Sequence, residues 1–231
     1  MAPDLIGMGE SGRPDGCQYR FTDHVRYLDS WFDALDLGPH LLVGHGWGAT
    51  FAFHRARRQP PAVAGIAYCE PVVGEREWSD FPESRRAYFQ SFRSTEGERL
   101  VLEENTFVEA IPNSVQRDLT PEEMARYRAP FAAAGSGRLP TLMFPRELPI
   151  SGEPADVVEA TKSDASFMAG SGIPKLLLVV SNGTGLTKRQ REECRRWPNQ
   201  QEVALPGKHF VQEDSPVEMA AAIMAFAERV F

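Results

Sequence analysis

The feature that most constrains this chain is a glycine-rich turn between an apolar strand and a helix. Residues 40–43 read His-Leu-Leu-Val, and residues 44–49 follow as Gly-His-Gly-Trp-Gly-Ala. Small residues flank position 46 because the strand and the helix of such a turn pack closely. Any tight strand-to-helix turn can use glycines, but this spacing is typical of a nucleophile elbow, which lifts one residue above the sheet. We therefore expect an α/β fold organised around residues 40–58.

Strands and helices alternate on both sides of this turn. Apolar residues recur on one face of residues 23–37, with Thr22 or Asp23 as the N-cap. The apolar runs are short, and a strand–helix–strand order predicts a parallel sheet with helices on its faces. The expected elements are helices over 23–37, 47–58 and from Ser215 onward, and strands over 40–43, 63–68, 175–180 and 202–205.

The character of the sequence changes between residues 74 and 145. Acidic and aromatic helices are predicted over 82–93 and 98–109, and a further helix starts at Pro121 with Thr120 as its N-cap. This block has no strand signal. We predict one α/β core, residues 1–73 and 146–231, interrupted by an all-helical cap, residues 74–145.

Bulk properties exclude several functional classes. The chain has 231 residues and a net charge of −7, so a nucleic-acid backbone is not expected as a partner. No apolar run approaches the roughly 20 residues that span a bilayer, and residues 1–4 do not resemble a signal peptide. The three cysteines are widely spaced and fit reduced thiols, with Cys69 a buried small residue. We expect a cytoplasmic protein that binds neither nucleic acid nor membrane.

Two residues suit acid–base chemistry beside the elbow. His209 follows a predicted strand near the C-terminus, and Glu70 lies at the end of the strand after the elbow helix. Catalytic groups of parallel sheets gather at such strand ends, where a carboxylate can orient an imidazole base. On position alone, His209 could instead be a loop histidine bound to the backbone, and Glu70 a solvated carboxylate.

The other histidines do not suggest a metal centre. Their spacing does not match that of metal ligands, and His24 is expected to face outward on its helix. We expect neither a metal nor a cofactor. The histidines other than His209 are His24, His40, His45 and His54.

Four segments resemble the haloalkane dehalogenases, and most closely the subgroup that includes the Renilla-type luciferase. The similarity extends over essentially the whole chain, including the cap. The segments are DLIGMGES (4–11), GHGWGA (44–49), FPRELPI (144–150) and HFVQED (209–214).

The resemblance implies an α/β-hydrolase fold and a two-step displacement. An aspartate at the elbow attacks the carbon that bears the halogen, and an activated water then hydrolyses the alkyl-enzyme ester. Glu70 would be the acid, His209 the base and Trp47 an N–H donor to the halide. The cap would supply an apolar pocket for a small apolar or halogenated molecule. Asn182 occupies the place where another subgroup carries its acid, which favours Glu70.

Two departures from the family pattern stand out. Position 46, where the family has aspartate, is Gly46, so the covalent intermediate cannot form there, and neither His45 nor Ser11 is expected to substitute. The family's first four strands and a His-Gly-Asn loop would lie upstream, and neither occurs in this sequence. The core is therefore expected to be N-terminally truncated, with strand 41–43 at an exposed apolar edge that invites self-association.

Three hypotheses follow for the function. The chain is a haloalkane dehalogenase-like hydrolase whose catalysis is impaired by Gly46. Alternatively, it is a non-catalytic protein that binds a small neutral molecule in the pocket. In the third hypothesis, the chain is a truncated gene product without independent function.

Overall fold

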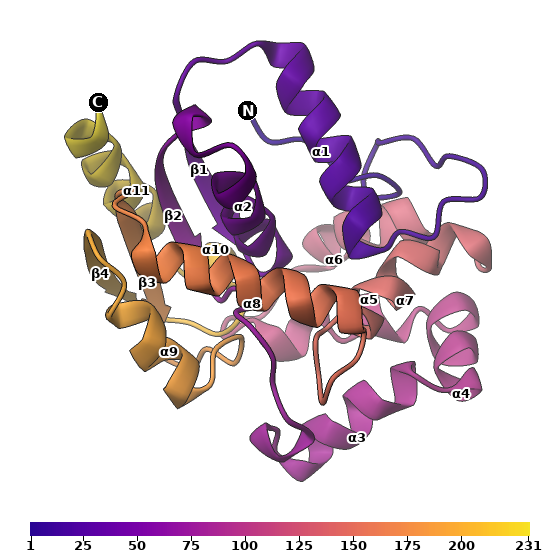
Figure 1. The fold of residues 1–231 in the computed structure, drawn as a ribbon. Coiled ribbons are helices and arrows are strands. Elements are labelled where there is room, and N and C mark those ends of the chain that lie inside the picture. Colours follow the sequence, from indigo (N-terminus) through magenta and orange to yellow (C-terminus); the bar gives the residue numbers. More distant parts are fainter. The chain divides into compact units, whose positions relative to one another are not determined.

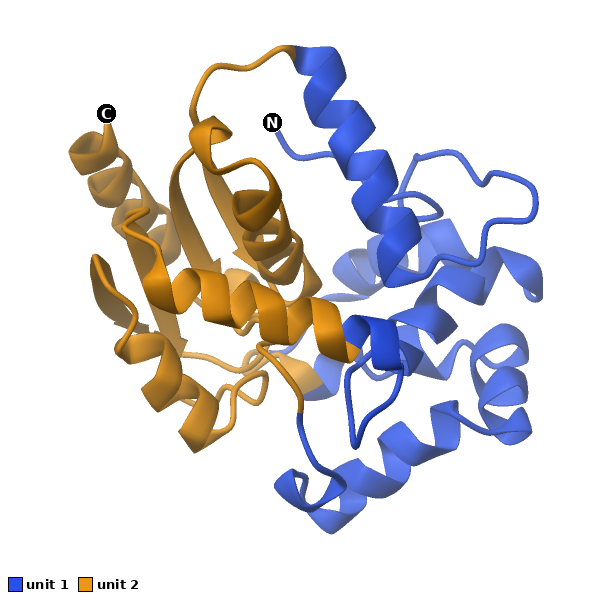
Figure 2. Cartoon of the chain, in the orientation of Figure 1, with its two compact units in different colours: residues 1–35, 76–113, 118–157 blue, residues 36–75, 114–117, 158–231 orange.

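The computed structural model describes residues 1–231 and divides into two compact units (Figures 1 and 2). Unit 1 comprises residues 1–35, 76–113 and 118–157, and unit 2 comprises residues 36–75, 114–117 and 158–231. The first 35 residues thus group with most of the predicted cap, whereas the sequence assigned them to the core.

A four-stranded parallel sheet in the order β1-β2-β3-β4 forms the centre of unit 2. Both faces of β2 and β3 are buried, which explains why their sequences are almost continuously apolar. The elements are β1 His40–His45, α2 Trp47–Arg58, β2 Val63–Cys69, β3 Lys175–Val180, α9 Lys188–Arg195, β4 Gln200–Leu205, α10 Val211–Asp214 and α11 Pro216–Val230; α8, Ala155–Gly170, begins in unit 1 and continues into unit 2.

Successive residues of β2 point to opposite faces of the sheet and meet different helices. Cys69 belongs to a buried cluster that includes Phe226 of α11, and Met219, Ile223 and Val230 of the same helix pack against this cluster. Tyr68 meets Phe53 of α2, with ring centroids 5.0 Å apart. Helices therefore cover both faces of the sheet, as the alternation of elements predicts (Figure 1).

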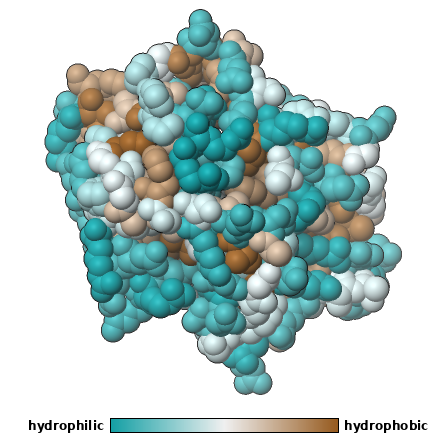
Figure 3. All heavy atoms as spheres, in the orientation of Figure 1, coloured by the Kyte–Doolittle hydropathy of each residue, from teal (hydrophilic) through white to brown (hydrophobic).

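β1 is an edge strand, because it pairs only with β2. The side chain of Val43 is 51% exposed. The predicted edge position of this strand is therefore present, but of its apolar residues only Val43 is exposed, since Leu42 is buried and Leu41 half-buried. On the face shown in Figure 3, apolar residues lie in small groups among hydrophilic ones.

Unit 1 is helical and packs around an aromatic cluster. Phe92 is fully buried against Tyr88, with ring centroids 4.5 Å apart, and against Phe107 at 5.8 Å. Residues 74–145 contain no strand, as expected. The helices are α1 Phe21–Leu35, α3 Glu83–Phe92, α4 Thr95–Glu98, α5 Thr106–Glu109, α6 Pro121–Arg128 and α7 Leu139–Arg146, with a π-helical turn over Arg99–Glu103.

The continuous helix predicted over 98–109 is wrong. The chain forms α4, the π turn and α5 instead, and Asn105 interrupts them with left-handed torsions, φ 59° and ψ 28°. Asparagine is one of the few residues that adopt this conformation readily. In contrast, α6 begins as predicted, because Thr120 and Glu123 form a reciprocal capping box.

The predicted start of α1 and the exposure of His24 are also wrong. The helix begins at Phe21, and Asp23 accepts a hydrogen bond from the amide of Arg20 rather than capping from outside the helix. His24 is buried, three residues after the buried Phe21 and therefore on the same helix face. Its ring meets Phe144 edge-on, with centroids 5.2 Å apart.

Candidate active site

The elbow in unit 2 has the backbone that a nucleophile position requires. Gly46 lies between β1 and α2 with φ 55° and ψ −125°, a combination that residues with side chains rarely adopt. Its amide donates to the carbonyl of Cys69 at 3.0 Å, and its own carbonyl accepts from Ala49 at 3.2 Å. A Cβ atom built on Gly46 would meet nothing within 4 Å. The backbone of Gly46 therefore has the geometry of an elbow, with open space where a side chain would begin.

Gly44 allows the strand and the helix to approach each other at this turn. A Cβ at Gly44 would lie 2.4 Å from the Cα of Ala49, closer than any real contact. A Cβ at Gly48 would meet nothing within 4 Å. Of the two glycines that flank the elbow, only Gly44 is required by packing.

Glu70 follows β2 directly and is 3% exposed. Its Oε2 accepts hydrogen bonds from the amides of Thr184 at 2.6 Å and Gly185 at 2.5 Å, in the loop after β3. This loop must be glycine-rich, because a Cβ at Gly183 would lie 2.3 Å from Oε1 of Glu70, and one at Gly185 would lie 2.6 Å from its carbonyl oxygen. Glu70 is a buried, held carboxylate rather than a solvated one.

His209 is the partner of this carboxylate. Its Nδ1 lies 3.3 Å from Oε2 of Glu70, and its side chain is 26% exposed. An Nδ1–H that donates to Glu70 leaves Nε2 as the basic nitrogen. The loop that carries His209 is anchored by Asp214, which accepts the amide of Lys208 at 2.9 Å. The structure therefore joins the two residues that the sequence selected.

The charge on Glu70 is stabilised despite its burial. Burial raises the pKa of Glu70, but the hydrogen bond and charge of His209 and the amides of Gly185 and Thr184 outweigh it. The pKa of Glu70 therefore lies below its usual value. An ionised carboxylate at this position can orient the imidazole and stabilise its protonated form.

His45 connects the elbow strand to the His209 loop. Its Nε2 lies 2.7 Å from the backbone carbonyl of His209, and the two rings have centroids 4.6 Å apart. Because a carbonyl only accepts, Nε2 of His45 carries the proton. Burial and the neighbouring His209 lower the pKa of His45 to about 4, so the ring is neutral near pH 7. His45 braces the site and does not replace the missing nucleophile.

Trp47 is the first residue of α2 and follows Gly46 directly. Its ring stacks on that of Phe51, with centroids 6.0 Å apart. The sequence therefore places Trp47 beside the elbow, as the resemblance implies. Its role towards a halide stays a prediction.

Two parts of the site were missed by the sequence reasoning. The amides of Thr184 and Gly185 hold Glu70, and His45 braces His209. The Gly-Thr-Gly run over 183–185 after an apolar strand was a visible signal for the first. Nothing in the sequence indicates the second, because His45 and His209 are 164 residues apart.

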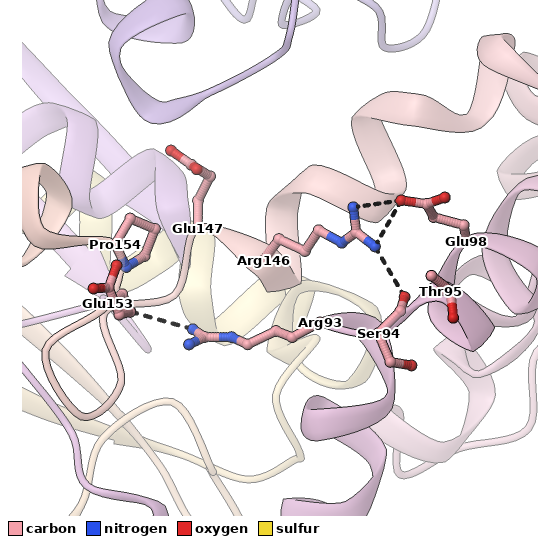
Figure 4. Close-up of a pocket in the computed structure, with 8 residues that line it drawn as sticks. All are labelled: Arg93, Ser94, Thr95, Glu98, Arg146, Glu147, Glu153 and Pro154. Atoms are coloured by element: carbon pink, nitrogen blue, oxygen red, sulfur yellow. Dashed lines mark hydrogen bonds and ion pairs between the residues drawn. The ribbon is translucent and has the colours of Figure 1, made fainter.

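A separate pocket of about 440 Å³ lies wholly within unit 1 (Figure 4). Its charged groups are engaged in the fold: Arg146 contacts Glu98 at 3.2 Å, and Glu147 accepts the amide of Phe21 at 2.8 Å. The guanidinium groups of Arg93 and Arg146 point away from each other in Figure 4. No converging pair resembles that of Glu70 and His209. The lining residues are Arg93, Ser94, Thr95, Glu98, Arg146, Glu147, Glu153 and Pro154.

The remaining candidate groups have structural surroundings. His54 and Arg57 both bind the buried Asp164, at 3.0 Å and 2.6 Å. Cys69 is buried as predicted, and none of the three cysteines forms a disulfide. No three His, Cys, Asp or Glu side chains are grouped to hold a metal ion. None of the helices combines the length and apolar character needed to cross a bilayer.

Comparison with known proteins agrees with this geometry. Residues 1–222 match the model of the alpha/beta hydrolase family. A haloalkane dehalogenase of Sphingobium indicum is 49% identical over 235 residues, which cover 100% of this chain and 79% of that protein. The coelenterazine h 2-monooxygenase of Renilla reniformis is 40% identical, over 99% of this chain and 74% of that protein.

Solved structures give the same result. The haloalkane dehalogenase DbeA from Bradyrhizobium elkani superposes with a TM-score of 0.94 and 42% identity, over 99% of this chain and 80% of that chain. A structure described as a putative ancestral haloalkane dehalogenase matches with the same TM-score and identity, over 99% and 81%. With the elbow, the carboxylate and the imidazole in one site, the chain belongs to the haloalkane dehalogenase family of α/β-hydrolases.

Proposed function

We propose that this chain is a haloalkane dehalogenase-like hydrolase whose first chemical step is disabled by Gly46. The open space above Gly46, beside an assembled Glu70–His209 pair, is the observation that carries the proposal. The substrate class is a small apolar or halogenated molecule, as the names of the relatives suggest.

In this reaction the two steps need different groups. The first step needs a carboxylate on position 46 to attack the carbon and expel the halide, and glycine has none. The second needs a water whose proton passes to Nε2 of His209 while Glu70 holds the opposite ring nitrogen. The chain retains the groups of the second step. Loss of a nucleophile typically lowers kcat by several orders of magnitude.

The test compares halide release from brominated alkanes by the chain as written and by Gly46→Asp. We expect no release above background from the first and release by the second, because the added side chain enters open space. Gly46→Asn is the matched control, since it fills the same volume without a carboxylate. Equal, low release by all three proteins would show that the defect is not confined to position 46.

The second candidate is a protein that binds a neutral apolar molecule without transforming it. Gly46 favours it, because the position carries neither the bulk nor the charge of an aspartate. A bound neutral ligand should raise the melting temperature of the chain as written more than that of Gly46→Asp. Equal shifts, or none with any ligand, would contradict this candidate.

A further inference from the structure

The glycine at the elbow leaves open space where a side chain would begin. An aspartate side chain is a carboxylate on one methylene, and acetate is the same group with a hydrogen in place of the bond to Cα. A Cβ at Gly46 meets no atom within 4 Å, so no neighbouring atom occupies the place where such a side chain would start. The surrounding frame is in place, because Gly46 is held on both sides by the backbone hydrogen bonds described above.

We propose that a small free carboxylate, formate or acetate, occupies this space and acts as an external nucleophile towards alkyl halides. The inference rests on the proposed function, since it requires the elbow to be aimed at the reacting carbon. It adds a co-substrate class that the aspartate-bearing relatives do not need.

The ionisable groups beside this space are already engaged with other partners. Glu70 is directed away to His209 and to the amides of Thr184 and Gly185, which accommodate its charge. His45 has its Nε2 proton engaged by the carbonyl of His209. A carboxylate above Gly46 would therefore add only the charge that an aspartate at this position would carry.

The steps balance without an oxidant or a metal. One formate oxygen forms a bond to the halogen-bearing carbon as the carbon–halogen bond breaks, giving an alkyl formate and a halide ion. Water then attacks the acyl carbon of that ester and passes its proton to Nε2 of His209. The acyl–oxygen bond breaks, and the products are the alcohol and regenerated formate, with one proton released to solvent. The alcohol keeps the oxygen that came from formate.

The experiment uses the chain as written, a short bromoalkane and ¹⁸O-labelled formate in unlabelled water. Halide release and the isotope content of the alcohol or alkyl formate are measured together, as a function of formate concentration. Gly46→Asn fills the space and serves as the control, and benzoate tests whether a bulky carboxylate is excluded. Gly46→Asp is assayed in parallel without formate.

We expect halide release to rise at least about tenfold with molar formate, and to remain orders of magnitude below Gly46→Asp because a free nucleophile lacks the advantage of attachment. The alcohol should carry ¹⁸O, and Gly46→Asn should not respond to formate. An active Gly46→Asp together with no formate response overturns this inference and leaves the proposed function standing. If Gly46→Asp and formate both fail, both proposals are overturned. Formate-dependent release that is equal in Gly46→Asn would place the reaction outside this space and also overturn the inference.

Discussion

At the scale of single residues, absent side chains shape this site as much as present ones. Gly44 permits the close approach of α2, and Gly183 and Gly185 leave room for Glu70. Each glycine is required by a contact with a particular atom, whereas Gly48 is not. The glycines of one motif therefore have different mutational consequences.

Gly183→Ala should displace the carboxylate of Glu70. The new Cβ would lie 2.3 Å from Oε1, and moving the carboxylate breaks its hydrogen bonds to the amides of Thr184 and Gly185. We expect a loss of about 1–3 kcal/mol in the free energy of unfolding, measured by urea denaturation. In the Gly46→Asp background, halide release should fall as well.

Gly48→Ala is the matched control. It adds a methyl group to open space within α2, where alanine is the better helix former by about 1 kcal/mol. Unchanged or slightly increased stability is expected. Equal losses in the two variants would show that Glu70 is not held as described.

Stability should fall on mild acidification because two imidazoles, those of His24 and His45, have lowered pKa values in the folded chain. Burial lowers the pKa of His24 to about 4, and burial with the neighbouring His209 lowers that of His45 to about 4, against 6.5 when exposed. Between these values the unfolded chain binds more protons, so the free energy of unfolding decreases as pH falls from 6.5 to 4. Each group contributes about 3 kcal/mol over that interval. The lowered pKa of Glu70 decreases the free energy of unfolding only as the pH falls below about 4.5, the pKa of this group in the unfolded chain.

Urea denaturation at pH 7, 5.5 and 4.5 measures this dependence. The free energy of unfolding of His24→Leu should fall less steeply between pH 6.5 and 4 than that of the chain as written, because one of the two groups is removed. An unchanged slope in His24→Leu would contradict the assignment.

At the scale of elements, the sequence predicted what depends on local patterns. α2 and β3 have the predicted bounds, since glycine, proline and apolar runs mark their ends. The pairing of Glu70 with His209 was also predictable, because strand ends of a parallel sheet converge. The break at Asn105 and the burial of His24 were not, because both depend on contacts made after the helices pack.

The edge strand β1 should mediate self-association. It pairs only with β2, and Val43 on it is 51% exposed. A lysine at an edge hinders strand pairing between chains, so Val43→Lys should lower the associated fraction in sedimentation velocity. Val203→Lys, on the opposite edge strand β4, is the control. An equal effect of both variants, or a chain that is monomeric at every concentration, would exclude β1 as the interface.

At the scale of the whole molecule, thiol accessibility reports whether the chain folds independently of any activity. Cys69 and Cys194 are buried, and burial raises the pKa of both, that of Cys194 to about 12. Cys17 is partly exposed. With DTNB, at most one thiol of the native protein should react rapidly, and all three should react in denaturant. Rapid reaction of three thiols under native conditions would support a gene product that does not fold.

The torsions of Gly46 bear on both the stability of the elbow and its chemistry. A residue with a side chain held at such torsions destabilises the fold by about 1–3 kcal/mol. That strain is useful only where the side chain takes part in the reaction. Glycine adopts these torsions without that cost, so under the proposed function the residue that disables the first step also stabilises the elbow. Gly46→Asp should therefore be less stable than the chain as written even if it recovers halide release. Stability of the elbow and the carboxylate that the proposed first step needs would then oppose each other at this one position.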